Sequence, residues 1–131
     1  MILIIGGAYE GKTEYAEKTL GISESEILDG RKCDLREVHF AKAVNNFHVL
    51  IKRLLEDNKI NTNEFIDEIY SVNPDITIIS DEIGCGIIPL EKSERLWREE
   101  TGRACCKAAE LSDVVVRVNC GIPSVIKGEL P

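Results

Sequence analysis

The chain has 131 residues, the size of one ordinary domain, and its 44% hydrophobic and 30% charged residues are typical of a globular protein. Its 23 acidic and 16 basic side chains give a net charge of −7, which repels a phosphate backbone and disfavours nucleic acid as a partner. No apolar run reaches the roughly 18 residues of a membrane span, and residues 1–7 lack the basic flank of a signal peptide, so we expect a single domain over residues 1–131 in the cytoplasm.

The first expected elements are a strand and a helix on either side of a glycine-rich turn. Residues 2–5 form a continuous apolar run, which is typical of a strand buried on both faces. A helix is expected from Lys12 to about Leu20, because Gly21 is a natural C-terminal stop. Residues 25–29 are candidates for a short second strand.

The next segment, residues 35–57, has apolar side chains at steps of three or four, which predicts one long amphipathic helix. Asp34 and Glu37 have the spacing of a capping box at its start. A shorter helix is expected after Asn61, ending before Pro74. The apolar residues of the long helix are Phe40, Val44, Phe47, Ile51 and Leu54.

The second half of the chain continues the alternation of strands and helices. Residues 76–80 are apolar and β-branched, as in a central strand, whereas residues 84–89 break any regular pattern. A long helix is expected over residues 93–111 and a last strand over 113–118, with only turns after it. This order predicts a three-layer α/β fold with a mostly parallel central sheet.

Five cysteines, an odd number at irregular spacing, favour reduced thiols over a disulfide framework. A metal site is the alternative, but no C-x-x-C pair occurs, and His39 and His48 do not lie at zinc-ligand spacing from any cysteine. We therefore favour structural thiols, since free cysteine usually behaves as a small buried hydrophobe.

The turn after the first strand matches the phosphate-loop (Walker A) pattern G-x-x-x-x-G-K-[ST] and lies between a strand and a helix, as that motif requires. In such a loop the backbone N–H groups surround phosphate oxygens, Lys12 reaches the β- and γ-phosphates and Thr13 offers its hydroxyl to Mg²⁺. A glycine-rich turn with a solvated lysine is the alternative. Glu10 would oppose the phosphates, so we expect it to point outward. The predicted nucleotide-binding residues are Gly6, Gly7, Ala8, Tyr9, Glu10, Gly11, Lys12 and Thr13.

A second acidic residue for the metal should lie at the end of a nearby strand. The pair Asp81 and Glu82, directly after residues 76–80, is one candidate, and Asp29 is the other. The alternative for each is a polar strand end that faces solvent. We favour the pair, because parallel sheets gather ligands at the carboxyl edge of their strands.

Three segments together resemble one family: MILIIGGAYEGKTEYAE (1–17), ISDEIGCGIIPLEKSERLWREETG (79–102) and AAELSDVVVRVNCGIP (108–123). They are similar to the adenosylcobinamide kinase / adenosylcobinamide-phosphate guanylyltransferase family of cobalamin biosynthesis. The resemblance implies a P-loop NTPase-like fold that binds ATP or GTP with Mg²⁺, and a kinase that phosphorylates a hydroxyl of a cobinamide-like molecule. It also implies self-association into a homo-oligomer.

The resemblance assigns roles residue by residue. Lys12, Asp81 and Glu82 are the implied catalytic residues, and Thr13 and Glu82 the implied metal ligands. An Arg-x-aromatic-Arg stretch would lie near the cleft, although glutamates at i,i+4 spacing allow it to be a solvated helix face instead. The implied cleft residues are Gly84, Gly86, Pro89, Arg95, Trp97 and Arg98.

The chain also departs from the family. Family members are longer in the segment before residues 76–80, where they carry the histidine that accepts GMP, and Cys105 and Cys106 replace an Asn-Gln pair. We expect His48 to lie on a helix flank that does not face the phosphate loop, and we therefore predict no guanylyltransferase activity. The alternative to a kinase is a non-catalytic nucleotide-binding protein with a regulatory or assembly role.

Overall fold

A computed structural model describes residues 1–57, 61–83 and 90–129. Its centre is a six-stranded sheet in the order β2-β3-β4-β1-β5-β6. The first five strands are parallel, and β6 pairs with β5 in the antiparallel sense. The strands are β1 (Ile2–Gly6), β2 (Ile27–Asp29), β3 (Ala43–Asn45), β4 (Thr77–Asp81), β5 (Val114–Asn119) and β6 (Ile122–Lys127).

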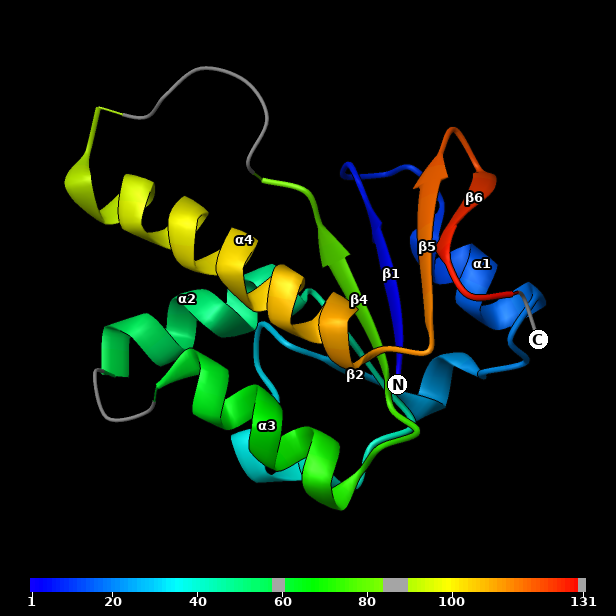
Figure 1. Ribbon diagram of the computed structural model, residues 1–131, viewed down its shortest axis with the longest axis horizontal. Helices are drawn as coiled ribbons and strands as arrows, with labels where there is room; N and C mark the ends of the chain where they lie inside the picture. The colour runs from blue at the N-terminus through cyan, green and yellow to red at the C-terminus, as the bar shows by residue number, and fades with distance from the viewer. Residues whose placement is uncertain (58–60, 84–89, 130–131) are drawn as a thin grey trace.

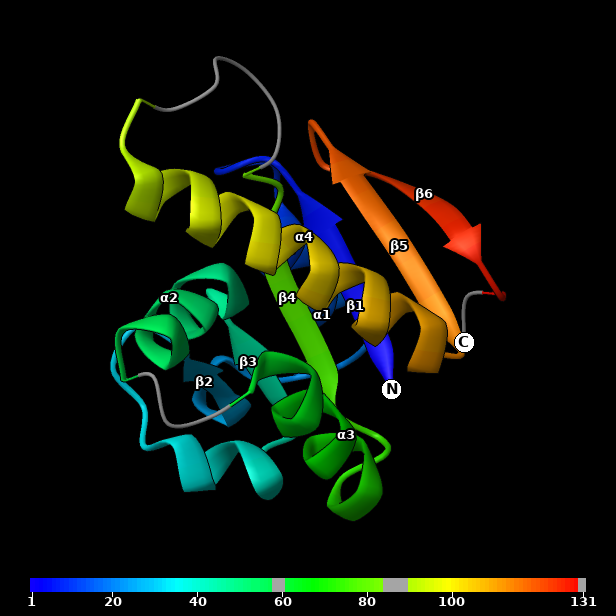
Figure 2. The same ribbon diagram turned by 60° about the vertical axis from the view of Figure 1, so that its left-hand side comes forward.

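Helices cover both faces of this sheet, which confirms the predicted three-layer, mostly parallel α/β fold. Three helices, α2 (Phe47–Asp57), α3 (Thr62–Val72) and α4 (Lys92–Leu111), lie on one face, and α1 (Lys12–Lys18) lies on the other (Figures 1 and 2). Two short 3₁₀ helices, η1 (Glu24–Glu26) and η2 (Leu35–His39), complete the described elements. No helix in the described ranges is long and apolar enough to cross a membrane.

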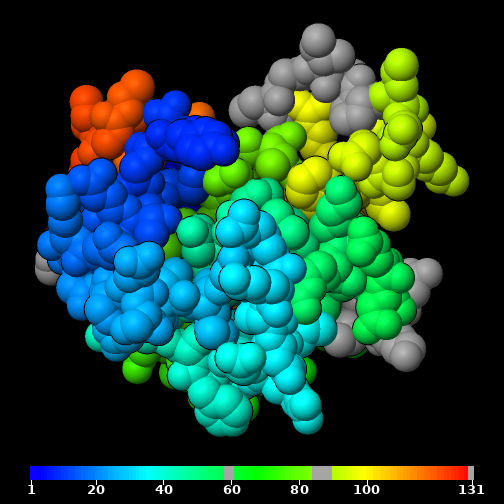
Figure 3. Space-filling model, turned by 180° about the vertical axis from the view of Figure 1, so that it is seen from behind, coloured from blue at the N-terminus to red at the C-terminus, as the bar shows by residue number. Residues whose placement is uncertain are grey.

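The two cores follow from the alternation of side chains along the strands. Leu3 and Ile78 face α2, α3 and α4 in the larger core, whereas Ile4 and Ile79 face α1 in the smaller one. All four residues are at most 1% exposed, as expected for strands in the middle of a parallel sheet. Seen from behind, the N-terminal third, in blue and cyan, covers most of the α1 face (Figure 3).

The prediction of one helix over residues 35–57 is wrong. This segment contains η2, then strand β3, then α2, and Asn46 between β3 and α2 has a left-handed φ of 54°. The apolar spacing misled because it spans two elements: Val44 is buried as a strand residue, whereas Phe47 is buried as a helical one. Phe40, the first residue of the expected stripe, is exposed. The capping box of Asp34 is present, but it caps η2.

The prediction that the chain ends only in turns is also wrong. Cys120 and Gly121 form a two-residue turn with φ angles of 51° and 76°, and β6 follows. Positive φ at both positions matches the right-handed twist of a hairpin, so this turn returns the chain along β5. Pro123 is tolerated because β6 is an edge strand.

Candidate functional site

The loop that the sequence predicts to bind phosphate, called the phosphate loop below, joins β1 to α1 at the edge of the sheet where the parallel strands end (Figure 1). Gly6 is required by a close approach, since a Cβ there would lie 2.4 Å from the carbonyl oxygen of Val118. Gly11 has a φ of 94°, which favours glycine, and Tyr9 is left-handed and fully exposed. The loop conformation therefore depends on glycines at the positions that the motif specifies.

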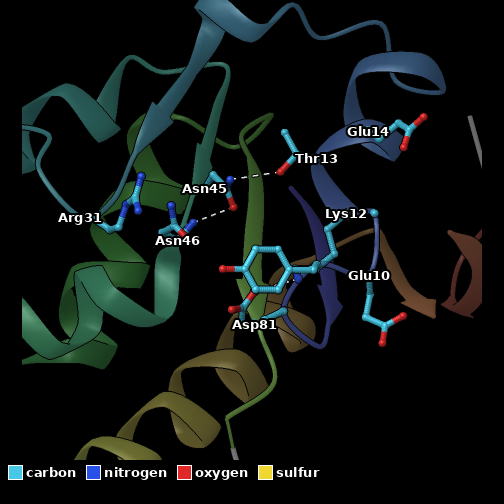
Figure 4. A pocket seen from close by; sticks show the side chains of 11 residues that line it. Glu10, Lys12, Thr13, Glu14, Arg31, Asn45, Asn46 and Asp81 are labelled. Carbon is cyan, nitrogen blue, oxygen red and sulfur yellow. Dashed lines mark hydrogen bonds and ion pairs between the residues drawn. The ribbon is translucent and has the colours of Figure 1, made fainter. Parts of the chain in front are cut away.

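Lys12 is the most buried charged side chain at this edge, with 6% of its surface exposed. Its Nζ donates a hydrogen bond to the carbonyl oxygen of Gly7 at 2.6 Å and lies 2.7 Å from Oδ1 of Asp81. Burial of an ammonium group is costly unless it is paired, and these two oxygens supply the pairing. The ammonium group is thus fixed across the loop, next to the carboxylate that ends β4 (Figure 4).

The side chain of Thr13, at the start of α1, accepts a hydrogen bond from a residue at the end of strand β3. Nδ2 of Asn45, the last residue of β3, donates to Oγ1 of Thr13 at 3.1 Å. Nδ2 of Asn46 donates to Oδ1 of Asp29 at 3.0 Å, which ties the ends of β2 and β3 together. Asn45 and Asn46 are absent from the sequence-based prediction, because their strand was assigned to a helix.

These groups surround a cavity of about 500 Å³ (Figure 4). One wall is the loop between β1 and α1, and the other consists of residues at or just after the ends of β2, β3 and β4. The volume lies in the range of small-molecule sites in proteins. The lining residues are Ala8, Tyr9, Glu10, Gly11, Lys12, Thr13, Glu14, Arg31, Asn45, Asn46 and Asp81.

Glu10 belongs to the loop but does not present its carboxylate to Lys12. Oε2 of Glu10 accepts a hydrogen bond from the backbone N–H of Cys120, in the turn between β5 and β6. The backbone oxygen of Glu10 also accepts from Gly121, at 2.8 Å. The carboxylate is therefore turned away from the centre of the site, as the sequence analysis expects (Figure 4).

His48 lies beside the site, next to the carboxylate that pairs with Lys12. The sequence analysis places it on a helix flank and does not predict this contact with Asp81. His48 is only 7% exposed, its Nδ1 accepts from the N–H of Asp81 at 3.2 Å, and its Nε2 lies 3.4 Å from Oδ2 of Asp81. The neutral tautomer with the proton on Nε2 satisfies both contacts. Burial lowers the pKa of His48, and the charge of Lys12 adds to this effect while Asp81 opposes it. Asp81 is thus held between Lys12 and a neutral imidazole.

Trp97 of α4 explains why His48 keeps this position. The indole Nε1 donates to the backbone oxygen of His48 at 2.7 Å, and the two rings stack with centroids 6.3 Å apart. Lys52 lies 4.7 Å above the indole ring. The aromatic residue of the Arg-x-aromatic-Arg stretch therefore contacts His48, which in turn contacts Asp81.

The other two acidic candidates have cationic partners. Glu82 lies 2.9 Å from Arg117 of β5 and does not contribute to the lining of the 500 Å³ cavity. Asp29 accepts the N–H of Arg31 Nε, which is shared between its two oxygens at 3.1 Å, and a second hydrogen bond from Nη2 at 2.9 Å. This pairing holds the pKa of Asp29 well below its usual range. Asp81 is the acidic side chain of the three that reaches Lys12.

The structure describes only some of the other residues that the resemblance assigns to the cleft. Arg95 and Arg98 lie on α4, and Nη1 of Arg95 donates to the backbone oxygen of Leu90 at 2.6 Å. Gly84, Gly86 and Pro89 lie outside the described residues.

Among the described residues, no cluster of three or more His, Cys, Asp or Glu side chains could hold a metal ion. A metal here would therefore depend on few protein ligands.

Comparison with known proteins identifies one family. A family model described as cobinamide kinase / cobinamide phosphate guanyltransferase matches residues 38–126, which is more than half of the chain. No curated protein matches the chain. The matched range includes β3, β4, α4 and β5 with Asp81, His48 and Trp97, whereas the phosphate loop precedes it. The loop is therefore supported by its own motif and geometry.

Proposed function

The chain belongs to the cobinamide kinase / cobinamide phosphate guanyltransferase family, and on this basis we propose that it is a cytoplasmic, nucleotide-dependent kinase. Membership of this family supports a nucleotide-binding function in cobalamin biosynthesis. The finer proposal is that residues 6–13 hold the phosphates of ATP or GTP and that the terminal phosphoryl group passes to a hydroxyl of a cobinamide-like acceptor. The observation that carries it is Lys12, buried in the loop and paired with Asp81.

Lys12 binds and orients the phosphates in this proposal. Its Nζ already lies within the loop, so it exchanges the carboxylate of Asp81 for phosphate oxygens without a large movement of its chain. The N–H groups at the start of α1 add a partial positive charge. Together they neutralise charge on the phosphoryl group during transfer.

The oxygen donors on the two walls fit a magnesium ion. Thr13 supplies a hydroxyl and Asp81 a carboxylate, and both are hard ligands of the kind that Mg²⁺ takes while it keeps several waters. When bound, Mg²⁺ would neutralise the negative charge of the phosphates. Asn45 holds the hydroxyl of Thr13 in place, and Nε2 of His48 lies 3.4 Å from Oδ2 of the Asp81 carboxylate. The assignment of the metal to Glu82 stays a prediction, and we favour Asp81 because it lines the cavity.

The transfer step forms one bond and breaks one. The acceptor oxygen bonds to the γ-phosphorus, and the bond between that phosphorus and the bridging oxygen breaks, so that the nucleoside diphosphate leaves. The proton of the acceptor hydroxyl passes to solvent water, since the carboxylate of Asp81 is assigned to the metal. Lys12 stays with the phosphates throughout and holds them in line with the acceptor.

The test is a transfer assay with cobinamide, Mg²⁺ and either ATP or GTP. Formation of cobinamide phosphate together with one diphosphate per product supports the proposal. Binding of Mg²⁺ and nucleotide without any transfer favours the alternative, a non-catalytic nucleotide-binding protein with a regulatory or assembly role. Failure of both nucleotides to bind would remove both functions.

A further inference from the structure

The turn between β5 and β6 packs against the phosphate loop at the same end of the sheet (Figure 1). A Cβ added to Gly11 would lie 3.2 Å from Cα of Gly121, and a Cβ added to Gly6 would lie 2.4 Å from the carbonyl oxygen of Val118. Glycine at these two positions therefore allows the loop to approach the hairpin backbone closely. The hairpin supports the loop on the side of β1 that is opposite β4.

Glu10 joins the loop to this turn through two hydrogen bonds. Its carboxylate accepts from the backbone N–H of Cys120, and its backbone oxygen accepts from the N–H of Gly121 at 2.8 Å. Two consecutive donors of the turn thus bind one residue of the loop. The bond to the side chain depends on the length of the glutamate, whereas the bond to the backbone does not.

The backbone on either side of Glu10 has conformations that need such support. Tyr9 has a φ of 60°, which is uncommon for a residue with a side chain, and Gly11 has a φ of 94°. The side chain of Tyr9 is fully exposed, so its packing does not hold this conformation. The contacts of Glu10 therefore hold the middle of the loop, whereas Lys12 holds its start through the carbonyl oxygen of Gly7.

The charge of Glu10 and its contact with the hairpin have opposite effects on phosphate binding. Glu10 lines the larger cavity, where a carboxylate repels phosphate oxygens. The contact favours binding, because loop N–H groups that are already in place bind phosphate without a further cost of ordering. The two effects can be separated, since repulsion depends on the charge of the side chain and the contact depends on its reach.

We propose that Glu10 is a positioning residue of the phosphate loop, whose side chain fixes the loop to the turn between β5 and β6 and so holds the loop N–H groups in place for phosphate. This inference rests on the proposed function, in which the loop binds ATP or GTP. It adds that the hairpin, which lies outside the loop motif, sets the nucleotide affinity through the contact between Glu10 and Cys120. Without this contact the loop samples other conformations, and the observed affinity falls with the fraction that can bind.

The experiment compares two pairs of proteins, and the two members of each pair have the same charge at position 10. Wild type and Glu10→Asp both carry a carboxylate, but aspartate is one methylene shorter and does not reach the N–H of Cys120. Glu10→Gln and Glu10→Ala are both uncharged, and glutamine keeps a carbonyl oxygen that accepts from this N–H.

Isothermal titration of ATP with Mg²⁺ measures the effect on affinity. Binding should be about fivefold weaker in Glu10→Asp than in the wild type, and about fivefold weaker in Glu10→Ala than in Glu10→Gln, the loss that one hydrogen bond of ordinary net strength gives. Glu17→Ala removes a carboxylate from α1, outside the loop and the turn, and should bind ATP as the wild type does.

The contact itself is measured without nucleotide, in ¹⁵N-labelled protein. The amide proton of Cys120 should move to lower frequency in Glu10→Asp and Glu10→Ala, because its acceptor is lost. The ¹⁵N–¹H NOE of residues 8–11 should fall in the same two variants, which reports faster motion of the loop, and it should stay at the wild-type value in Glu10→Gln. Melting curves show that all the variants are folded.

The outcomes separate the two proposals. Equal ATP affinity within each pair, or an unchanged Cys120 amide and unchanged loop NOE values in Glu10→Ala, overturns the positioning role of Glu10. If ATP does not bind even to the wild type, while the loop loses order in Glu10→Ala and keeps it in Glu10→Gln, the proposed nucleotide function fails and the positioning of the loop stands.

Discussion

Replacing Asp81 with asparagine should change nucleotide affinity in opposite directions with and without Mg²⁺. In the protein without nucleotide, the carboxylate lies 2.7 Å from Nζ of Lys12 and competes with any phosphate for it. Asparagine keeps the shape of the side chain but removes the charge. Asp81→Asn should therefore bind ATP more tightly than the wild type when Mg²⁺ is absent, and it should lose most of the additional affinity that Mg²⁺ gives.

The size of the effect follows from Coulomb's law. On binding, Lys12 exchanges one anion, the carboxylate of Asp81, for another, the phosphate. Its attraction to Asp81 at 2.7 Å, about 6 kcal/mol gross at an effective dielectric constant of about 20, therefore largely cancels. What remains is the repulsion between Asp81 and the phosphates, about 2 kcal/mol at about 8 Å in the same medium. Asp81 is 24% exposed, so solvent screens part of this. We expect a net gain of about 1.4 kcal/mol, which is tenfold in affinity.

The assay is isothermal titration of ATP into wild type and Asp81→Asn, each in EDTA and in excess Mg²⁺, at low salt. Melting curves of both proteins show whether the variant is folded. Equal or weaker binding of ATP by Asp81→Asn in EDTA would refute the reasoning that Asp81 competes with phosphate for Lys12.

Three further predictions concern the neighbours of this carboxylate. Glu82→Gln should impair Mg²⁺-dependent transfer more than nucleotide binding if Glu82 serves the metal or the acceptor, and unchanged transfer in steady-state assays would assign that role to Asp81 or Asp29. Incubation with GTP and Mg²⁺ should give no covalent GMP adduct by intact-mass spectrometry, because both ring nitrogens of His48 face Asp81; an adduct lost in His48→Asn or His39→Asn would contradict this. Because burial lowers the pKa of His48, the unfolded chain binds its proton more readily, so stability should fall as the pH drops below about 6.5. Urea unfolding at pH 7 and pH 5 should show a smaller fall in His48→Asn, with His39→Asn as the control, and an unchanged fall in His48→Asn would argue against the shift.

Local signals were enough to predict the phosphate loop and the strands and helix around it. The apolar run of β1, the glycines and Lys12 are adjacent in sequence, and the loop is built from those residues alone. The strand at residues 76–80 and the helix at residues 93–111 were equally easy to predict. The sequence of β4 has a strand pattern throughout, and that of α4 has a helical pattern throughout.

The partners of the loop could not be predicted in the same way. Strand β3 has three residues, too few to establish an alternating pattern, and the apolar spacing continued from Val44 into Phe47. Once β3 was read as helix, Asn45 could not be placed at the edge of the sheet beside Thr13. The contact of His48 with Asp81 was missed for the same reason, because it depends on how α2 follows β3. These errors concern contacts between residues that are far apart in the sequence, and the local spacing of apolar residues does not predict such contacts.

The most direct test of the central claim is isothermal titration of ATP and GTP, with Mg²⁺, into the wild type and Lys12→Ala. The account predicts saturable binding of at least one nucleotide to the wild type, and a loss of at least tenfold, about 1.4 kcal/mol, in Lys12→Ala. The variant should remain folded by circular dichroism, since the other contacts of the loop do not involve this side chain. Equal affinity of the two proteins would contradict the claim that residues 6–13 hold the phosphates of a nucleotide.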